Sequence, residues 1–90
     1  MSEDQTITIR ITWFARLAEA AGCDHELMTV ADGATIGAVL DQIRQDRPAL
    51  AEALGDGRNI RAAVNEAITG NDHVLQDGDE LALFPPFTGG

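Results

Sequence analysis

A strict alternation of apolar and polar residues near the start of the chain constrains its fold more than any other feature. Between Thr6 and Phe14 every second residue is large and apolar, and threonines and an arginine stand between them; the apolar set is Ile7, Ile9, Ile11 and Trp13. Successive side chains of a β-strand point to opposite faces, so this period of two predicts a strand with one buried face.

An amphipathic helix is predicted to pack on that face. Thr35 stands before four apolar residues spaced i, i+3, i+4 and i+7, namely Ile36, Val39, Leu40 and Ile43. Threonine favours the N-cap position, where its hydroxyl accepts a hydrogen bond from a free backbone N–H, so Thr35 is the expected start. Pro48 is expected to end this helix because proline disfavours helical geometry in the residue before it. Leu50 and Leu54 suggest a further short turn of helix.

The remaining elements complete an order that is typical of one fold. A short helical turn is expected before Gly22, and strands are expected at about Asp24–Val30, over Ile60–Val64 and over Leu81–Phe84. Two strands, one main helix and then more strands predict the β-grasp, an α+β fold in which a mixed sheet packs on one helix. By analogy with that fold, the first and last strands pair in parallel at the centre of the sheet. We expect a single domain over residues 1–90 with a projecting tail, 85–90.

Composition restricts the partners. Fifteen acidic and six basic residues give a formal charge of -9, which repels nucleic acids and anionic membranes and favours a basic protein surface, although solubility alone also explains it. All six basic residues are arginines, so no side chain of the chain can accept an isopeptide bond. Neither a membrane-spanning apolar run nor a signal peptide is visible, and a soluble, cytoplasmic protein is expected. A lone Cys23, with His25 and His73 far apart in sequence, predicts neither a disulfide nor a metal site.

The last residues are the only group that points to chemistry. Pro85 and Pro86 fix φ near -65° and favour an extended chain that projects from the last strand. Gly89 and Gly90 carry no Cβ, so a narrow channel can close around their backbone. At about 3.3 Å per residue, the tail from Pro86 reaches roughly 16 Å, far enough to enter the active site of another protein. The expected partner contacts are Phe84, Pro85, Pro86, Phe87 and Thr88.

The ending Phe-Pro-Pro-x-x-Gly-Gly resembles that of a ubiquitin-like sulfur carrier family, which includes the small subunit of molybdopterin synthase. The chain fits the length and element order of that family, although Phe87 stands where a smaller aliphatic residue is usual. Further resemblance lies in three separated segments: Trp13-Phe14-Ala15-Arg16-Leu17, Val64-Asn65 and Asp77-Gly78-Asp79-Glu80.

The resemblance implies a noncatalytic subunit that works through the carboxylate of Gly90, with Gly89 as its necessary neighbour. In this family a partner enzyme uses ATP and Mg²⁺ to adenylate the terminal carboxylate, and a persulfide sulfur donor displaces AMP to give a thiocarboxylate. The large subunit of molybdopterin synthase then uses that sulfur to build the dithiolene of molybdopterin. The chain itself is expected to bind no cofactor and no metal.

Two other functions fit the same ending. The chain is alternatively a ubiquitin-like modifier whose Gly90 is joined to lysines of other proteins, or a sulfur carrier for thiamine synthesis or tRNA thiolation. A third interpretation is a β-grasp interaction module whose Gly-Gly ending is incidental.

Overall fold

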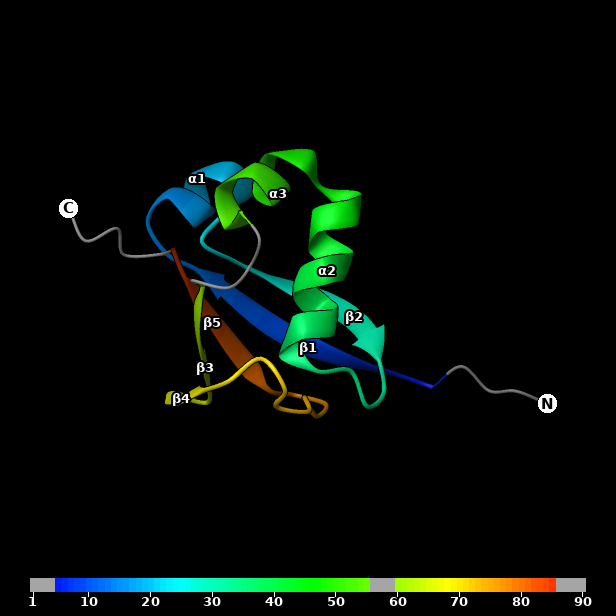
Figure 1. Cartoon of the computed structure of the whole chain (residues 1–90). Helices are drawn as coiled ribbons and strands as arrows, with labels where there is room; N and C mark the ends of the chain where they lie inside the picture. The colour runs from blue at the N-terminus through cyan, green and yellow to red at the C-terminus, as the bar shows by residue number, and fades with distance from the viewer. Residues whose placement is uncertain (1–4, 56–59, 86–90) are drawn as a thin grey trace.

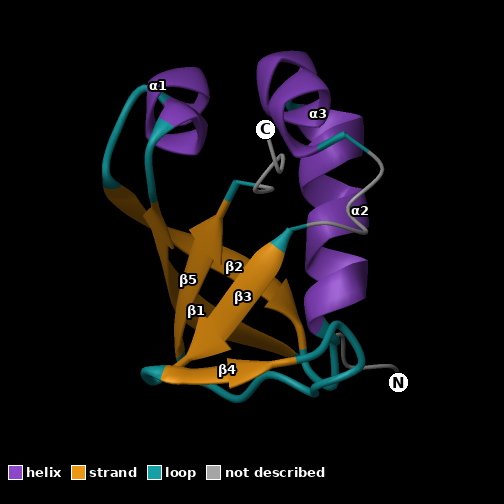
Figure 2. Ribbon diagram, turned by 60° about the vertical axis from the view of Figure 1, so that its left-hand side comes forward, coloured by secondary structure: helices purple, strands orange, loops and turns teal. Residues whose placement is uncertain are grey.

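The computed structural model describes residues 5–55 and 60–85 of the chain, and these form one five-stranded sheet with three helices on one side of it (Figures 1 and 2). The strands are β1 (Thr6–Trp13), β2 (His25–Ala31), β3 (Arg61–Val64), β4 (Ala67–Thr69) and β5 (Glu80–Phe84). The helices are α1 (Arg16–Ala21), α2 (Ile36–Asp46) and α3 (Pro48–Leu54). In the described ranges no helix is both long and apolar enough to cross a membrane.

The strand order is β2-β1-β5-β3-β4, which places β5 in the middle of the sheet. β1 runs antiparallel to β2 and parallel to β5, with Ile11 opposite Leu81 and Trp13 opposite Leu83. β5 is also antiparallel to β3. The predicted parallel pairing of the first and last strands is therefore confirmed, and with it the mixed sheet of the β-grasp.

The hydrophobic core lies between the sheet and the helices. Ile9 and Ile11 are fully buried and Trp13 is 2% exposed, as the alternation predicted. The four apolar residues of α2 are also buried, and its first turn is capped by Thr35, whose Oγ1 accepts a hydrogen bond from the N–H of Ala38 at 3.1 Å. The core of the described chain includes no polar or charged residue. Any polar chemistry in this part of the protein therefore takes place at its surface.

The structure differs from the predicted elements in two places. Pro48 does follow the end of α2, but it also begins α3, because the first position of a helix needs no N–H donor and suits the fixed φ of proline. The second difference is β4, which the sequence analysis missed. Asn65 and Glu66 have φ values of 50° and 75°, and this left-handed pair turns the chain back so that β4 pairs with β3.

Candidate functional site on the open face of the sheet

The predicted tail begins where β5 ends. Phe84 is the last residue of β5 and Pro85 follows it, half-buried, whereas Pro86, Phe87, Thr88, Gly89 and Gly90 lie outside the described residues. Because β5 is parallel to β1, the point where the tail begins lies beside the end of β1, at the same edge of the sheet (Figure 1). The predicted roles of the last five residues remain predictions.

A groove of about 490 Å³ lies next to this point, on the face of the sheet opposite the helices. We call it the open-face groove. Two small residues, Ala63 of β3 and Ala82 of β5, lie opposite each other in the sheet and both line it. Ile68 of β4 lies opposite Ala63 on the other side and is 68% exposed. Small side chains in the middle strands and a large one at the edge make this part of the sheet concave and apolar.

Two stacked aromatic rings border the groove. The rings of Phe14 and Phe84 are parallel to within 6°, with centroids 4.5 Å apart. Phe14 is 40% exposed, and its N–H donates to the carbonyl oxygen of Leu83 at 3.3 Å. Leu83 itself is fully buried in the core. Phe84 follows Leu83 in the strand and therefore lies on the face opposite the core, where it offers an apolar surface at the point where the tail begins.

Charged residues complete the lining of the groove. Glu66, from the β3–β4 turn, and Glu80, at the start of β5, are both exposed carboxylates. Arg61 lies opposite Phe84 in the β3–β5 ladder and supplies a positive charge near the tail. An apolar groove with carboxylates at its margin suits a partner that presents an apolar side chain beside a basic one. This arrangement agrees with the prediction from net charge that the partner is basic.

Two of the sequence segments that resemble the sulfur carriers meet at the start of β5. The side chain of Asn65 donates to Oδ1 of Asp79 at 3.0 Å and accepts from the N–H of Glu80 at 3.0 Å. The other carboxylate oxygen of Asp79 accepts from the N–H of Gln76 at 2.9 Å. Asn65 thus ties the β3–β4 turn to the turn before β5. These residues hold the groove in shape rather than react.

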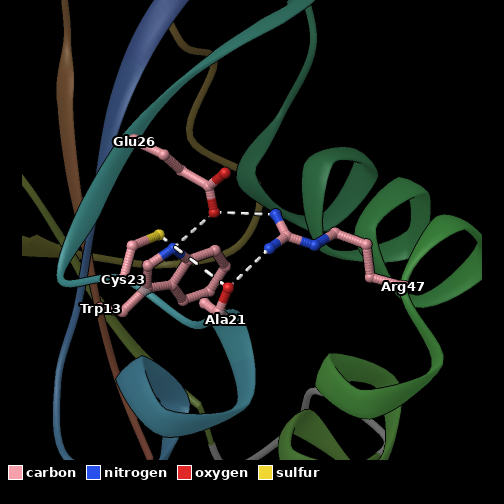
Figure 3. Close-up of polar contacts among 5 residues, drawn as sticks. All are labelled: Trp13, Ala21, Cys23, Glu26 and Arg47. Carbon is pink, nitrogen blue, oxygen red and sulfur yellow. Dashed lines mark hydrogen bonds and ion pairs between the residues drawn. The ribbon is translucent and has the colours of Figure 1, made fainter.

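A second polar cluster surrounds Glu26 of β2, on the face of the sheet that carries the helices (Figure 3). Its Oε2 accepts hydrogen bonds from Nε1 of Trp13 at 2.8 Å and from Nη1 of Arg47 at 2.7 Å. Burial alone raises the pKa of Glu26, but the hydrogen bonds from Arg47 and Trp13 outweigh it and hold that pKa below its usual range. The carboxylate is therefore ionised near neutral pH.

Cys23 lies next to this cluster, with Sγ 4.0 Å from the carbonyl oxygen of Ala21. Loss of solvation raises the pKa of the thiol, and the nearby charge of Glu26 raises it further. Asp24, its neighbour in sequence, contributes less to the raised pKa. A raised pKa favours the protonated thiol, which is a weaker nucleophile than the thiolate.

The sequence predicted Phe84 as a partner contact but did not predict the other two large apolar residues of the groove, Phe14 and Ile68. The resemblance to the sulfur carriers includes Phe14 without giving it a role, although its exposure follows from the same alternation that buries Trp13. Ile68 was missed with its strand, because three residues are too few to show a period of two.

Comparison with known proteins agrees with the fold. Residues 11–90 match the ThiS family. The chain is 40% identical over 82 residues to the molybdopterin synthase sulfur carrier subunit of Escherichia coli, covering 91% of this chain and 99% of that protein. It is 39% identical over 82 residues to small archaeal modifier protein 1 of Haloferax volcanii, covering 86% and 94% of the two chains. The crystal structure of SAMP1 from that organism superimposes with a TM-score of 0.75 at 35% identity, over 92% of this chain and 99% of the other.

These matches extend over nearly the whole chain, and the solved structure has the same β-grasp architecture that the sheet order shows here. The chain therefore belongs to the ThiS family, as a ubiquitin-like protein homologous to the sulfur carrier subunits of molybdopterin synthase.

Proposed function

We propose that the chain carries sulfur as a thiocarboxylate on Gly90 and donates it, within molybdopterin synthase, to the dithiolene of molybdopterin. The observation that most supports this function is the open-face groove, which lies beside Phe84 and Pro85, where the chain leaves the sheet towards Gly90. A carrier needs such a surface, because the proteins that load and unload it must hold the fold while the tail enters their active sites.

The chemistry begins with activation, because a carboxylate lacks a good leaving group. A partner enzyme with ATP and Mg²⁺ forms an acyl-adenylate at Gly90 and releases pyrophosphate. The terminal sulfur of a protein persulfide then attacks the carbonyl carbon and displaces AMP, and reduction of the resulting acyl disulfide by a thiol leaves the thiocarboxylate. The large subunit of molybdopterin synthase positions this soft nucleophile against cyclic pyranopterin monophosphate.

The chain itself contributes the surface that binds the partner and the tail that extends into the partner's active site. Phe14, Ile68 and Phe84 provide the apolar contact, and Glu66 and Glu80 favour a basic residue of the partner. Gly89 and Gly90 allow close approach to the backbone, since neither has a Cβ. The acids, bases and metal ion of both reactions are supplied by the partners.

Intact mass measurement tests the loading step. The protein is incubated with its adenylating enzyme, ATP, Mg²⁺ and a persulfide donor, and we expect a mass increase equal to the replacement of one oxygen by sulfur. The same reaction with Gly90 deleted is the control and should show no increase. An increment that persists in the deletion variant, or none in the full chain, would refute the proposal.

Protein modification is a second candidate function, and the 39% identity to small archaeal modifier protein 1 favours it specifically. An activated Gly90 would then be attacked by a lysine amine of a target protein instead of by a persulfide. Immunoblots of cells that express a tagged chain distinguish the two. A ladder of conjugates that disappears when Gly90 is deleted supports the modifier, and a thiocarboxylate without such a ladder supports the carrier.

A further inference from the structure

We propose that the Glu26–Arg47 ion pair is a positioning device for the docking surface: it fixes both ends of segment 13–21 and so holds Phe14 against Phe84. This inference rests on the proposed docking role of the open-face groove. The pair lies on the helix-covered side of the sheet, and its hydrogen bonds go to Trp13 and Ala21, which are not among the groove residues. It acts through Trp13 and α1.

The ion pair contacts the segment at both of its ends (Figure 3). At the first end, Glu26 accepts the indole hydrogen bond of Trp13. At the second end, Nη2 of Arg47 donates to the carbonyl oxygen of Ala21 at 3.1 Å, at the last residue of α1. Because Glu26 and Arg47 also bind each other at 2.7 Å, the two ends are joined through one bridge. The guanidinium comes from the junction of α2 and α3, so the bridge ties the segment to the main helical layer as well.

The segment between these anchors contains a strained residue. Ala15 has φ 55° and ψ -131°, a conformation that L-residues rarely adopt and that glycine adopts freely. It follows Phe14 directly, and the turn is closed by a hydrogen bond from the N–H of Leu17 to the carbonyl oxygen of Phe14 at 3.1 Å. A strained residue persists only where its surroundings hold it. Here the buried side chains of Trp13 and Leu17 and the ion pair provide that support.

Movement of this segment would alter the groove at the point where the tail begins. Phe14 stacks on Phe84 at 4.5 Å and its N–H bonds to Leu83, the residue before Phe84. A loosened Ala15 would let the ring of Phe14 sample other orientations. The partner would then have to order it on binding, which costs affinity.

The solvent exposure of the Glu26–Arg47 pair indicates that its role is to position segment 13–21 rather than to stabilise the fold. The side chains of Arg47 and Glu26 are 37% and 27% exposed, and partly exposed ion pairs contribute little to folding free energy. Their geometry is nevertheless specific, because one carboxylate oxygen accepts two donors and one guanidinium reaches two acceptors. Arginine presents several donors in a planar arrangement, and lysine could not replace it in both contacts.

The test compares Glu26→Ala, which removes the oxygen that accepts both hydrogen bonds, with Glu26→Gln, which keeps an acceptor oxygen and the shape of the side chain. Thr35→Ala is the matched control, because it destabilises the fold through the N-cap of α2, away from the segment. Two readouts are taken for each variant: NMR ring shifts and cross-relaxation between Phe14 and Phe84, and the Kd for the large subunit of molybdopterin synthase.

We expect Glu26→Ala to lose the Phe14–Phe84 cross-relaxation and to raise the Kd by roughly three- to tenfold, while Glu26→Gln and Thr35→Ala keep both near those of the unaltered chain. Unchanged Phe14–Phe84 contacts in a folded Glu26→Ala variant overturn the inference. So does a Thr35→Ala variant that loses these contacts and affinity to the same extent as Glu26→Ala. If the ring contacts change while the unaltered chain does not bind the large subunit, the positioning role stands and the proposed function fails. If Glu26→Ala does not fold, Arg47→Ala takes its place, because it removes the donors to both Glu26 and the carbonyl oxygen of Ala21. A loss of the ring contacts in folded Arg47→Ala supports the inference, and their retention overturns it.

Discussion

Replacing Ile68 by alanine should weaken partner binding much more than it weakens the fold. The side chain is 68% exposed, so about two thirds of it remains to be buried by a docking protein. At about 0.8 kcal/mol for each of the three carbons lost, the full side chain is worth about 2.4 kcal/mol and the exposed share about 1.6 kcal/mol. Since 1.4 kcal/mol is a factor of ten, the Kd should rise roughly fifteenfold. The free energy of unfolding should fall by no more than about 0.8 kcal/mol.

Leu27 provides the matched control. It is 71% exposed and lies on β2, where it is not part of the groove. Calorimetric titration of each variant with the large subunit of molybdopterin synthase gives the Kd, and urea unfolding followed by Trp13 fluorescence gives the stability. We expect Leu27→Ala to bind as the unaltered chain does. The reasoning fails if both variants lose affinity equally, or if Ile68→Ala binds within twofold of the unaltered chain.

Three further changes test the elements that support the groove. Asn65→Ala removes two hydrogen bonds and places alanine at φ 50°, so its free energy of unfolding in urea should fall by about 2–3 kcal/mol. Asn65→Gly removes the same hydrogen bonds but tolerates the positive φ, so it should recover about 1 kcal/mol of that loss. Equal losses in the two variants would contradict the argument from backbone strain. Ala15→Gly should raise the melting temperature measured by circular dichroism. The relief of about 1–3 kcal/mol of backbone strain exceeds the entropic cost of glycine, which is about 0.5–1 kcal/mol. A melting temperature below that of the unaltered chain would argue against strain at Ala15. Because the folded-state pKa of Glu26 is lowered, its contribution is present above the usual carboxyl pKa and is lost as pH falls through the lowered value. The stability difference between the unaltered chain and Glu26→Gln should therefore shrink from neutral pH to about pH 3, and a constant difference would exclude this linkage.

The sequence predicted the parts of the fold that repeat with a regular period. Eight residues of alternation identified β1, and the spacing of Ile36, Val39, Leu40 and Ile43 identified α2, because burial of one face leaves a pattern in any strand or helix long enough to show it. The Gly-Gly ending and its prolines led to the prediction of a reactive carboxylate at Gly90 without any knowledge of the fold.

The groove could not be predicted in the same way, since it depends on register between strands. Ala63 and Ala82 form its middle only because β3 and β5 pair with those residues opposite each other. The bridge from Glu26 to Arg47 joins residues 21 positions apart, and an isolated glutamate in a strand looks like any solvent-facing charge. Such contacts follow from the assembled sheet and helices rather than from local pattern.

The central position of β5 also affects when the protein can fold during its synthesis. β1 and β3 are both paired with β5, so a nascent chain that stops before Glu80 lacks the strand that joins the two halves of the sheet. Contacts between such distant segments form only after both have left the ribosome. A chain interrupted before Glu80 therefore lacks the open-face groove, because β5 supplies Glu80, Ala82 and Phe84 to its lining. Topology thus restricts the groove, which is the docking surface proposed above, to chains that have been synthesised almost to the C-terminal tail.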